Sequence, residues 1–202
     1  MTGNIGKIIR QPRMRKVRKK YTAKEFFEFT KDKNERYELI DGKIYLMASP
    51  SVEHQEITGY IYRKFGNYLE DKDCRVFIAP LDVVLFEKSD KDKKDNAQNV
   101  FQPDVFVVCD QNKISKNKIN GAPDFIIEVV SPSSLAKDYY DKLNAYRKHG
   151  VKEYWIINPN TKEIFVYINK KSKDDIRAYS FNDKIKVSIF DDFEIDFKKL
   201  KL

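Results

Sequence analysis

The order of apolar and polar residues predicts two N-terminal helices separated by a β-hairpin. Apolar residues recur at helical spacing from Ser51 to about Glu70, and Ser51 is a favourable first residue for that helix. A shorter helix is expected from Thr22 to about Lys31, because its Thr-Ala-Lys-Glu start is typical of a capping box. Between the helices, two apolar runs flank Asp41-Gly42, a dipeptide that favours a two-residue hairpin turn.

The central part of the chain predicts a strand–helix–strand unit. Residues 125–130 form a strongly apolar run, a helix is expected from about Ser134 to His149 with Gly150 at its end, and residues 153–157 form the next strand. Short links between these elements favour a right-handed unit with parallel strands. Other strands are expected at 75–79, 82–86 and 103–109, and at 163–168, 176–181 and 184–190 as a meander. The predicted fold class is an α/β sandwich with a mixed central β-sheet flanked by helices.

The 202 residues include 41% hydrophobic and 13% aromatic side chains, enough for a core and too many for a disordered chain. No apolar run reaches the roughly 20 residues of a membrane-spanning helix.

The net charge of +8 is unevenly distributed, because residues 1–20 contain no acid and the remainder holds equal numbers of acids and bases. We therefore expect a flexible basic arm at 1–20 and a single domain at 21–202. The polar segment 87–99 is expected to be a solvated, mobile loop. The arm residues expected to attract nucleic-acid phosphates are Lys7, Arg10, Arg13, Arg15, Lys16, Arg18, Lys19 and Lys20.

The chain has two cysteines, Cys74 and Cys109, which are too few for a disulfide scaffold. No secretory segment precedes the predicted domain. The sequence therefore predicts reduced cysteines that act as small hydrophobic residues in a cytoplasmic protein.

Two carboxylates in apolar strands suggest a metal-binding or catalytic site. Glu128 lies within Phe-Ile-Ile-Glu-Val-Val, where an ionised carboxylate is costly unless it is paired or bound to a metal, and Asp104 opens another strand. If these strands are neighbours, the two acids supply hard oxygen ligands for Mg²⁺ or Mn²⁺. Such a site suits phosphodiester hydrolysis, because the metal lowers the pKa of a bound water. The residues alone leave an alternative open, namely structural salt bridges to buried cations.

A cation is expected beside these acids. The residue two positions after Glu128, on the same strand face, is Val130, which is uncharged. Lys142 on the following helix is long enough to reach back over the sheet end, although an ordinary solvated lysine has the same spacing.

Several segments together resemble the Uma family of restriction-endonuclease-like proteins, a branch of the PD-(D/E)xK nuclease superfamily. The resemblance extends from about Tyr37 to about Tyr167. The segments that carry it are Gln102-Pro103-Asp104, Gly121-Ala122-Pro123-Asp124, Glu128-Val129-Val130-Ser131-Pro132-Ser133, Lys142-Leu143 and Gly150-Val151-Lys152-Glu153-Tyr154-Trp155.

This resemblance implies the restriction-endonuclease-like fold and Mg²⁺-dependent cleavage of DNA. Asp104 matches the acid of the first motif and Glu128 the acid of the second, so both are expected to be catalytic and to bind metal. Lys142 matches the lysine that some members of the family carry on the following helix. Asp124 also follows a proline, but it lies about 13 Å from Glu128 along one strand, so Asp104 is the better candidate.

Glu38, Asp82 and His54 occupy further positions at which the family resembles this chain, and each is a possible additional ligand or catalytic group. The alternative for Glu38 is a cross-strand partner in the hairpin. For Asp82 it is a residue at a turn or strand start, and for His54 it is a capping or packing histidine.

These features predict a metal-dependent DNA endonuclease that uses a metal-activated water. A homodimer would allow it to cut both strands of a duplex. The alternative is a catalytically inactive nucleic-acid-binding module that retains the nuclease fold, which Val130 in place of a lysine motivates. A third interpretation is a structural protein whose acids only form salt bridges.

Overall fold

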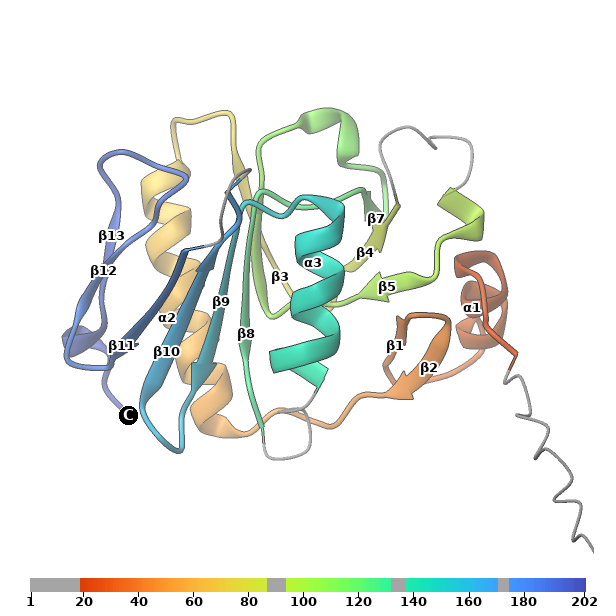
Figure 1. The fold of residues 1–202 in the computed structure, drawn as a ribbon, viewed down its shortest axis with the longest axis horizontal. Helices are drawn as coiled ribbons and strands as arrows, with labels where there is room; N and C mark the ends of the chain where they lie inside the picture. The colour runs from red at the N-terminus through yellow and green to blue at the C-terminus, as the bar shows by residue number, and fades with distance from the viewer. Residues whose placement is uncertain (1–18, 87–93, 132–136, 171–174) are drawn as a thin grey trace, which may run out of the picture.

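A six-stranded mixed sheet forms the centre of the protein in a computed structural model that describes residues 19–86, 94–131, 137–170 and 175–202 (Figure 1). Its strand order is β11-β10-β9-β8-β6-β3. The strands are β3 (Arg75–Ile78), β6 (Val105–Val108), β8 (Phe125–Val129), β9 (Glu153–Asn158), β10 (Glu163–Ile168) and β11 (Asp175–Ser180). Strands β8 and β9 pair in parallel, and the other neighbours are antiparallel.

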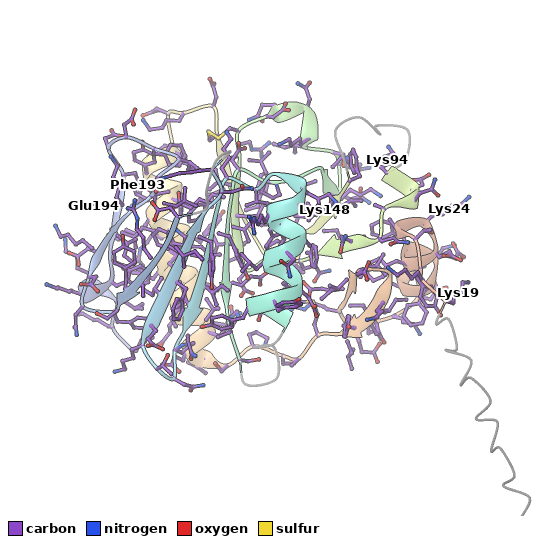
Figure 2. All side chains as sticks on the ribbon, in the orientation of Figure 1. Lys19, Lys24, Lys94, Lys148, Phe193 and Glu194 are labelled. Carbon is purple, nitrogen blue, oxygen red and sulfur yellow. A yellow bond between two sulfur atoms is a disulfide. The ribbon has the colours of Figure 1, made fainter. Side chains whose placement is uncertain are left out.

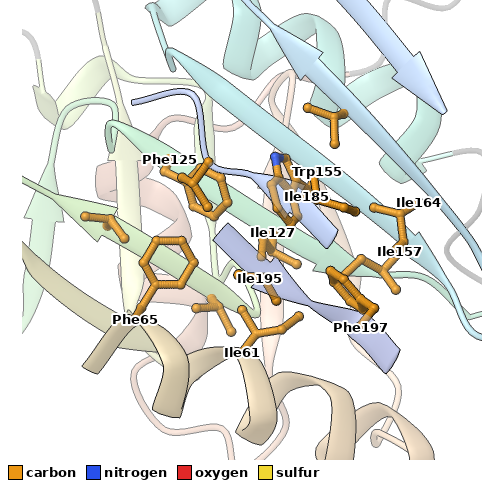
Figure 3. Close-up of a cluster of buried hydrophobic side chains, with 14 of the residues drawn as sticks. Ile61, Phe65, Phe125, Ile127, Trp155, Ile157, Ile164, Ile185, Ile195 and Phe197 are labelled. Carbon is orange, nitrogen blue, oxygen red and sulfur yellow. The ribbon is translucent and has the colours of Figure 1, made fainter. Parts of the chain in front are cut away.

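Helices cover both faces of this sheet (Figure 1). Helix α2 (Val52–Leu69) packs on the face that carries Phe125 and Ile127, in the cluster of buried side chains drawn in Figure 3. A π-helical turn (Lys137–Lys142) continues into α3 (Leu143–His149) and packs on the opposite face, with Ile126. The alternation of neighbouring strand residues between two buried faces explains why β8 is apolar at every position except Glu128.

The predicted strand–helix–strand unit is confirmed for the described residues, and the expected helix start at Ser134 lies outside them. The helical segment joins two parallel strands, with Ile127 opposite Trp155. Gly150 ends α3 in a left-handed conformation with φ of 86°, which glycine adopts without a steric penalty. The strands expected at 163–168 and 176–181 also form, as the antiparallel neighbours β10 and β11.

A second, five-stranded sheet has the order β2-β1-β5-β4-β7 and packs with α1 (Ala23–Thr30). Its strands are β1 (Tyr37–Ile40), β2 (Lys43–Leu46), β4 (Asp82–Leu85), β5 (Asn99–Phe101) and β7 (Lys118–Asn120). The hairpin prediction is confirmed, with φ of 46° at Asp41 and 73° at Gly42. The capping box is also confirmed, because Thr22 and Glu25 bond each other's backbone N–H groups.

The prediction that residues 184–190 form the third strand of the meander is wrong. Strand β12 (Lys184–Lys186) pairs with β13 (Glu194–Asp196) in a separate hairpin. This hairpin packs beside α2 on the same face of the six-stranded sheet, because Ile185 and Ile195 lie opposite each other and are fully buried in the cluster that the helix shares with that face. Phe193, labelled beside Glu194 in Figure 2, extends this contact. Short 3₁₀ turns include Gln111–Lys113 and Phe197–Lys199.

The cysteine prediction is also wrong, because Cys74 and Cys109 form a disulfide. Strands β3 and β6 are antiparallel with Arg75 opposite Val108, so the residues just beyond this pair meet each other. The two cysteines are separated by 35 positions, and no local pattern indicates their pairing.

The basic arm and the polar loop lie mainly outside the described residues, which exclude 1–18 and 87–93. Two arm residues are described: Lys19 pairs with Glu25 at 2.9 Å, and Lys20 pairs with Asp41 at 2.7 Å. Figure 2 shows Lys19 beside α1. Within the described ranges, no helix combines the length and apolar character needed to cross a membrane.

Candidate active site

Glu128 is a buried acid on β8 that faces the helical segment joining β8 to β9. Strand alternation places its side chain on the same face as Ile126, toward α3. Oε1 of Glu128 accepts hydrogen bonds from Nζ of Lys142 at 2.9 Å and from the hydroxyl of Tyr146 at 2.7 Å. The carboxylate is therefore stabilised within an apolar strand by two groups from the next element.

Lys142 is the last residue of the π-helical turn and is 4% exposed. Its ammonium lies 3.0 Å from Oε1 of Glu38 and 3.3 Å from Oδ1 of Asp138, in addition to Glu128. Burial lowers the pKa of Lys142, but the surrounding carboxylates outweigh burial and hold it well above its usual value. The lysine is therefore a fixed positive charge.

Asp104 lies immediately before β6, beside the position of Glu128 on β8. Val105 pairs with Ile127, so the antiparallel register brings the preceding acid level with Glu128. Oδ2 of Asp104 accepts a hydrogen bond from the Val129 backbone N–H at 2.8 Å and lies 3.0 Å from Nε2 of His54. Two neighbouring strands and the N-terminal end of α2 thus converge at one place.

His54 belongs to the first turn of α2. Its backbone N–H donates to Oγ of Ser51, the N-cap residue, while its ring contacts Asp104. The imidazole ring of His54 therefore reaches the candidate site. The side chain that caps α2 is that of Ser51 and not that of His54. Nδ1 of His54 is buried and has no hydrogen-bond partner among the described residues.

The cluster has more negative than positive charge. Four carboxyl groups, those of Glu38, Asp104, Glu128 and Asp138, influence the single ammonium of Lys142. Burial raises the pKa of Glu128 well above its usual value, Lys142 opposes that rise, and the other three acids add to it. A bound proton or a divalent cation would relieve this excess negative charge.

A cavity of about 640 Å³ opens onto this cluster, and Asp104, Glu128 and Lys142 line it. In the described part of the chain, Oδ1 of Asp104 and Oε2 of Glu128 accept no hydrogen bond. Two carboxylate oxygens fit Mg²⁺ or Mn²⁺, which take their remaining ligands from water and substrate phosphate. The described residues contain no group of three or more His, Cys, Asp or Glu side chains suited to a metal, so the described side chains alone would not complete the coordination.

Two of the other residues singled out in the sequence bond Gln102. Oε1 of Glu38 accepts the Gln102 backbone N–H at 3.0 Å as well as contacting Lys142, so Glu38 links the second sheet to the site. Asp82 accepts from the Gln102 side chain at 3.0 Å at the start of β4, and it is not among the residues that line the cavity.

Asp124 lies apart from this cluster. Its carboxylate accepts the Cys109 backbone N–H at 2.9 Å and pairs with Lys152 at 2.7 Å, which is a structural role.

Sequence reasoning missed Asp138 and Tyr146. Both lie four positions from Lys142, one before it and one after, a spacing that places side chains on one side of a helix. That spacing is a signal that would have identified them once Lys142 had been chosen.

Comparisons with known proteins agree with this architecture. The Uma2 family, described as "Putative restriction endonuclease", matches residues 23–198. The Synechocystis sp. protein slr1290 is 28% identical over 181 residues, covering 88% of this chain and 90% of that protein. A second Synechocystis sp. protein, sll1609, is 26% identical over 140 residues, covering 68% and 74%.

A solved structure described as a "putative nuclease belonging to DUF820", from Anabaena variabilis, shares the fold with a TM-score of 0.70. The sequences are 20% identical, and the match covers 89% of this chain and 96% of the other. The predicted fold class, a mixed sheet flanked by helices in a restriction-endonuclease-like α/β arrangement, is confirmed. Because the family match covers residues 23–198, the chain belongs to the Uma2 family of restriction-endonuclease-like proteins.

Proposed function

We propose that the protein is a metal-dependent endonuclease that hydrolyses phosphodiester bonds of DNA. The observation that carries this proposal is the placement of Asp104, immediately before β6, beside Glu128 on the neighbouring strand β8, each with one oxygen available beside a shared cavity. A charged lysine, Lys142, is bonded to one of them. The family description supports the nuclease class of activity.

Asp104 and Glu128 are the residues that would hold Mg²⁺ or Mn²⁺. When bound there, such an ion lowers the pKa of a water and neutralises charge on the scissile phosphate. Lys142 and Tyr146 hold Oε1 of Glu128, which leaves its Oε2 for the cavity. His54 and the Val129 N–H hold Oδ2 of Asp104 in the same way.

DNA binding and double-strand cleavage would involve the basic arm and a second copy of the chain. The basic residues of the arm would supply salt-dependent attraction to phosphates, and the acidic cavity would then act on the bound strand. Cleavage of both strands of a duplex would use two copies of the chain related by twofold symmetry.

A nicking assay on plasmid DNA with Mg²⁺ or Mn²⁺ tests the activity. We expect nicking by the wild type and by Glu56→Gln, an exposed acid on α2, and none by Asp104→Asn or Glu128→Gln. Circular dichroism checks that each variant is folded. Nicking that survives both substitutions would contradict the assignment of the site.

A second candidate is a module that binds DNA without cutting it. Two observations favour it: the described residues lack a group of three metal-ligating side chains, and Val130 stands where a lysine would adjoin Glu128. In the same experiment, wild-type protein that binds DNA but is as inert as both variants would support this module. Calorimetric titration with Mn²⁺ adds a direct test of metal binding.

A further inference from the structure

The cavity beside Asp104 has an apolar wall as well as an acidic one. The residues of this apolar wall are Leu46, Met47, Pro50, Ile78 and Ala79. Leu46 is 59% exposed and Ile78 is 37% exposed, although large apolar side chains are usually buried. Exposed apolar side chains grouped along a cavity mark a binding surface.

This wall is built from the edges of both larger sheets. Leu46 ends β2, an edge strand of the five-stranded sheet, and Ile78 ends β3, an edge strand of the six-stranded sheet. The Ala79 backbone N–H donates to the Asp104 carbonyl at 3.2 Å. The apolar wall therefore continues directly into the proposed metal-binding acids.

Arg36 adds a positive charge to the same cavity. The Met47 backbone N–H donates to the Arg36 carbonyl at 2.9 Å, so the arginine adjoins the apolar wall. It lies two residues before Glu38, a spacing that places both side chains on one face of the chain. Among the described residues its guanidinium has no ion pair or hydrogen bond, whereas Lys142 is already bonded to three carboxylates. An unpaired guanidinium is well suited to a phosphate group.

The shape of the cavity favours a small unit of nucleic acid. Its volume of about 640 Å³ is in the range of pockets that enclose one small molecule. Glu128 and Asp104 lie deep, at 4% and 9% exposure. In a regular duplex the bases are stacked inside and paired, so they cannot lie on an apolar wall while a phosphate reaches these acids.

We propose that the cavity receives an unpaired nucleotide, with its base on the apolar wall and its phosphate between Arg36 and the carboxylates. The preferred substrate is then a DNA single strand, or the unpaired stretch of a flap or strand end. This inference rests on the proposed nuclease function, and it specifies the class of DNA on which that site acts.

Binding in Ca²⁺ tests the inference apart from cleavage, because a divalent cation with oxygen ligands offsets the charge of the carboxylates beside the phosphate. Fluorescence anisotropy would compare a labelled single strand with a blunt duplex of the same sequence, and a denaturing gel would check that both stay intact. We expect the wild type to bind the single strand about tenfold more tightly, because base contacts add to phosphate attraction only when the bases are unpaired. Equal binding, or a preference for duplex, would overturn the inference.

Two variants test whether the apolar wall causes the preference for single-stranded DNA. Leu46→Ser and Ile78→Ser should each reduce single-strand affinity severalfold and leave duplex affinity unchanged. Ile176→Ser is the matched control, because Ile176 is 61% exposed on β11 and does not line this cavity. An unchanged preference in both wall variants would contradict the placement of the base.

Cleavage with Mn²⁺ separates failure of the inference from failure of the proposed function. A protein that cuts duplex and single strand at equal rates is a nuclease, and the inference is then wrong. A protein that cuts neither, but prefers the single strand and loses that preference in Leu46→Ser, is not a nuclease, and the inference about the bound strand survives.

Discussion

The ammonium of Lys142 lies 2.9 Å from Oε1 of Glu128, although the two residues are fourteen positions apart and belong to different elements. Val130, which shares the strand face of Glu128, packs into the apolar cluster beneath α3. A cation delivered from the helix therefore takes the place that a lysine on the strand would have. Its position depends on the packing of the helical segment against β8.

Replacing Lys142 by Met should destabilise the protein strongly. The change leaves three buried carboxyl groups without their cation, which typically costs about 3–5 kcal/mol. Urea denaturation measures this loss. Lys148→Met on the same helix is the control, because Lys148 is exposed (Figure 2) and its replacement should change stability by no more than about 0.5 kcal/mol. Equal stabilities of the two variants would contradict the structural role of Lys142.

Tyr146→Phe should remove a hydrogen bond to Glu128 without disturbing the packing of the ring. The hydroxyl donates to Oε1 of Glu128 at 2.7 Å, and loss of such a bond costs about 1–2 kcal/mol. The free energy of unfolding should fall by that amount in urea titrations. Tyr140→Phe serves as the comparison, because Tyr140 is 70% exposed on the same helical segment and should have no effect.

Glu153 should make stability depend on pH. Burial raises the pKa of this acid to about 7 in the folded state, against the pull of its hydrogen bonds to Trp155 and to the backbone of Ile189. In the unfolded state it ionises at its ordinary pKa of 4.5. Between these two pH values the folded protein keeps a proton that the unfolded chain loses. Stability should therefore fall by about 3 kcal/mol as the pH rises from 4.5 to 7, and level off above that.

The variant Glu153→Gln should lack this component of the pH dependence. The measurement is the difference in unfolding free energy between wild type and variant at several pH values from 4.5 to 8. Glu163→Gln is a matched control, since Glu163 is an exposed acid on the neighbouring strand β10. A wild-type profile that parallels that of Glu153→Gln would show that Glu153 ionises normally.

The disulfide between Cys74 and Cys109 should stabilise the fold. Closing a loop between residues separated by 35 positions restricts the unfolded chain and contributes about 4 kcal/mol. Treatment with dithiothreitol, or replacement of both cysteines by serine, should lower the melting temperature. The serine variant should be insensitive to the reductant. Thiol alkylation followed by mass spectrometry verifies the bond, and two free thiols before reduction would contradict it.

Removal of residues 1–18 should weaken binding to DNA. The deletion keeps Lys19 and Lys20, which pair with Glu25 and Asp41 in the described domain, and removes the other six basic residues of the arm. Affinity measured from 50 to 200 mM salt should become lower and less salt-dependent, with a slope reduced by up to about 4–5. Unchanged affinity at low salt would exclude a binding role for the arm.

Local features of this fold are predictable from the sequence, whereas contacts between distant segments are not. The hairpin at Asp41-Gly42, the capping box at Thr22 and the parallel strands around Trp155 follow from turn chemistry and periodicity, which operate over a few residues. The pairing of Lys184–Lys186 with a strand near Glu194 depends on how a hairpin packs beside α2, and residue periodicity carries no information about that.

Residue chemistry alone identifies the unusual positions of this chain. Glu128 and Asp104 are identifiable because a carboxylate in an apolar strand carries a desolvation cost that some partner must offset. Folding brings in the partners, which are His54 for Asp104 and both Lys142 and Tyr146 for Glu128. Folding likewise joins two cysteines that the sequence predicts to be reduced. The reason is physical, because the need for a partner is a property of one residue and its neighbours, whereas the partner's identity depends on strand register and helix packing between distant segments.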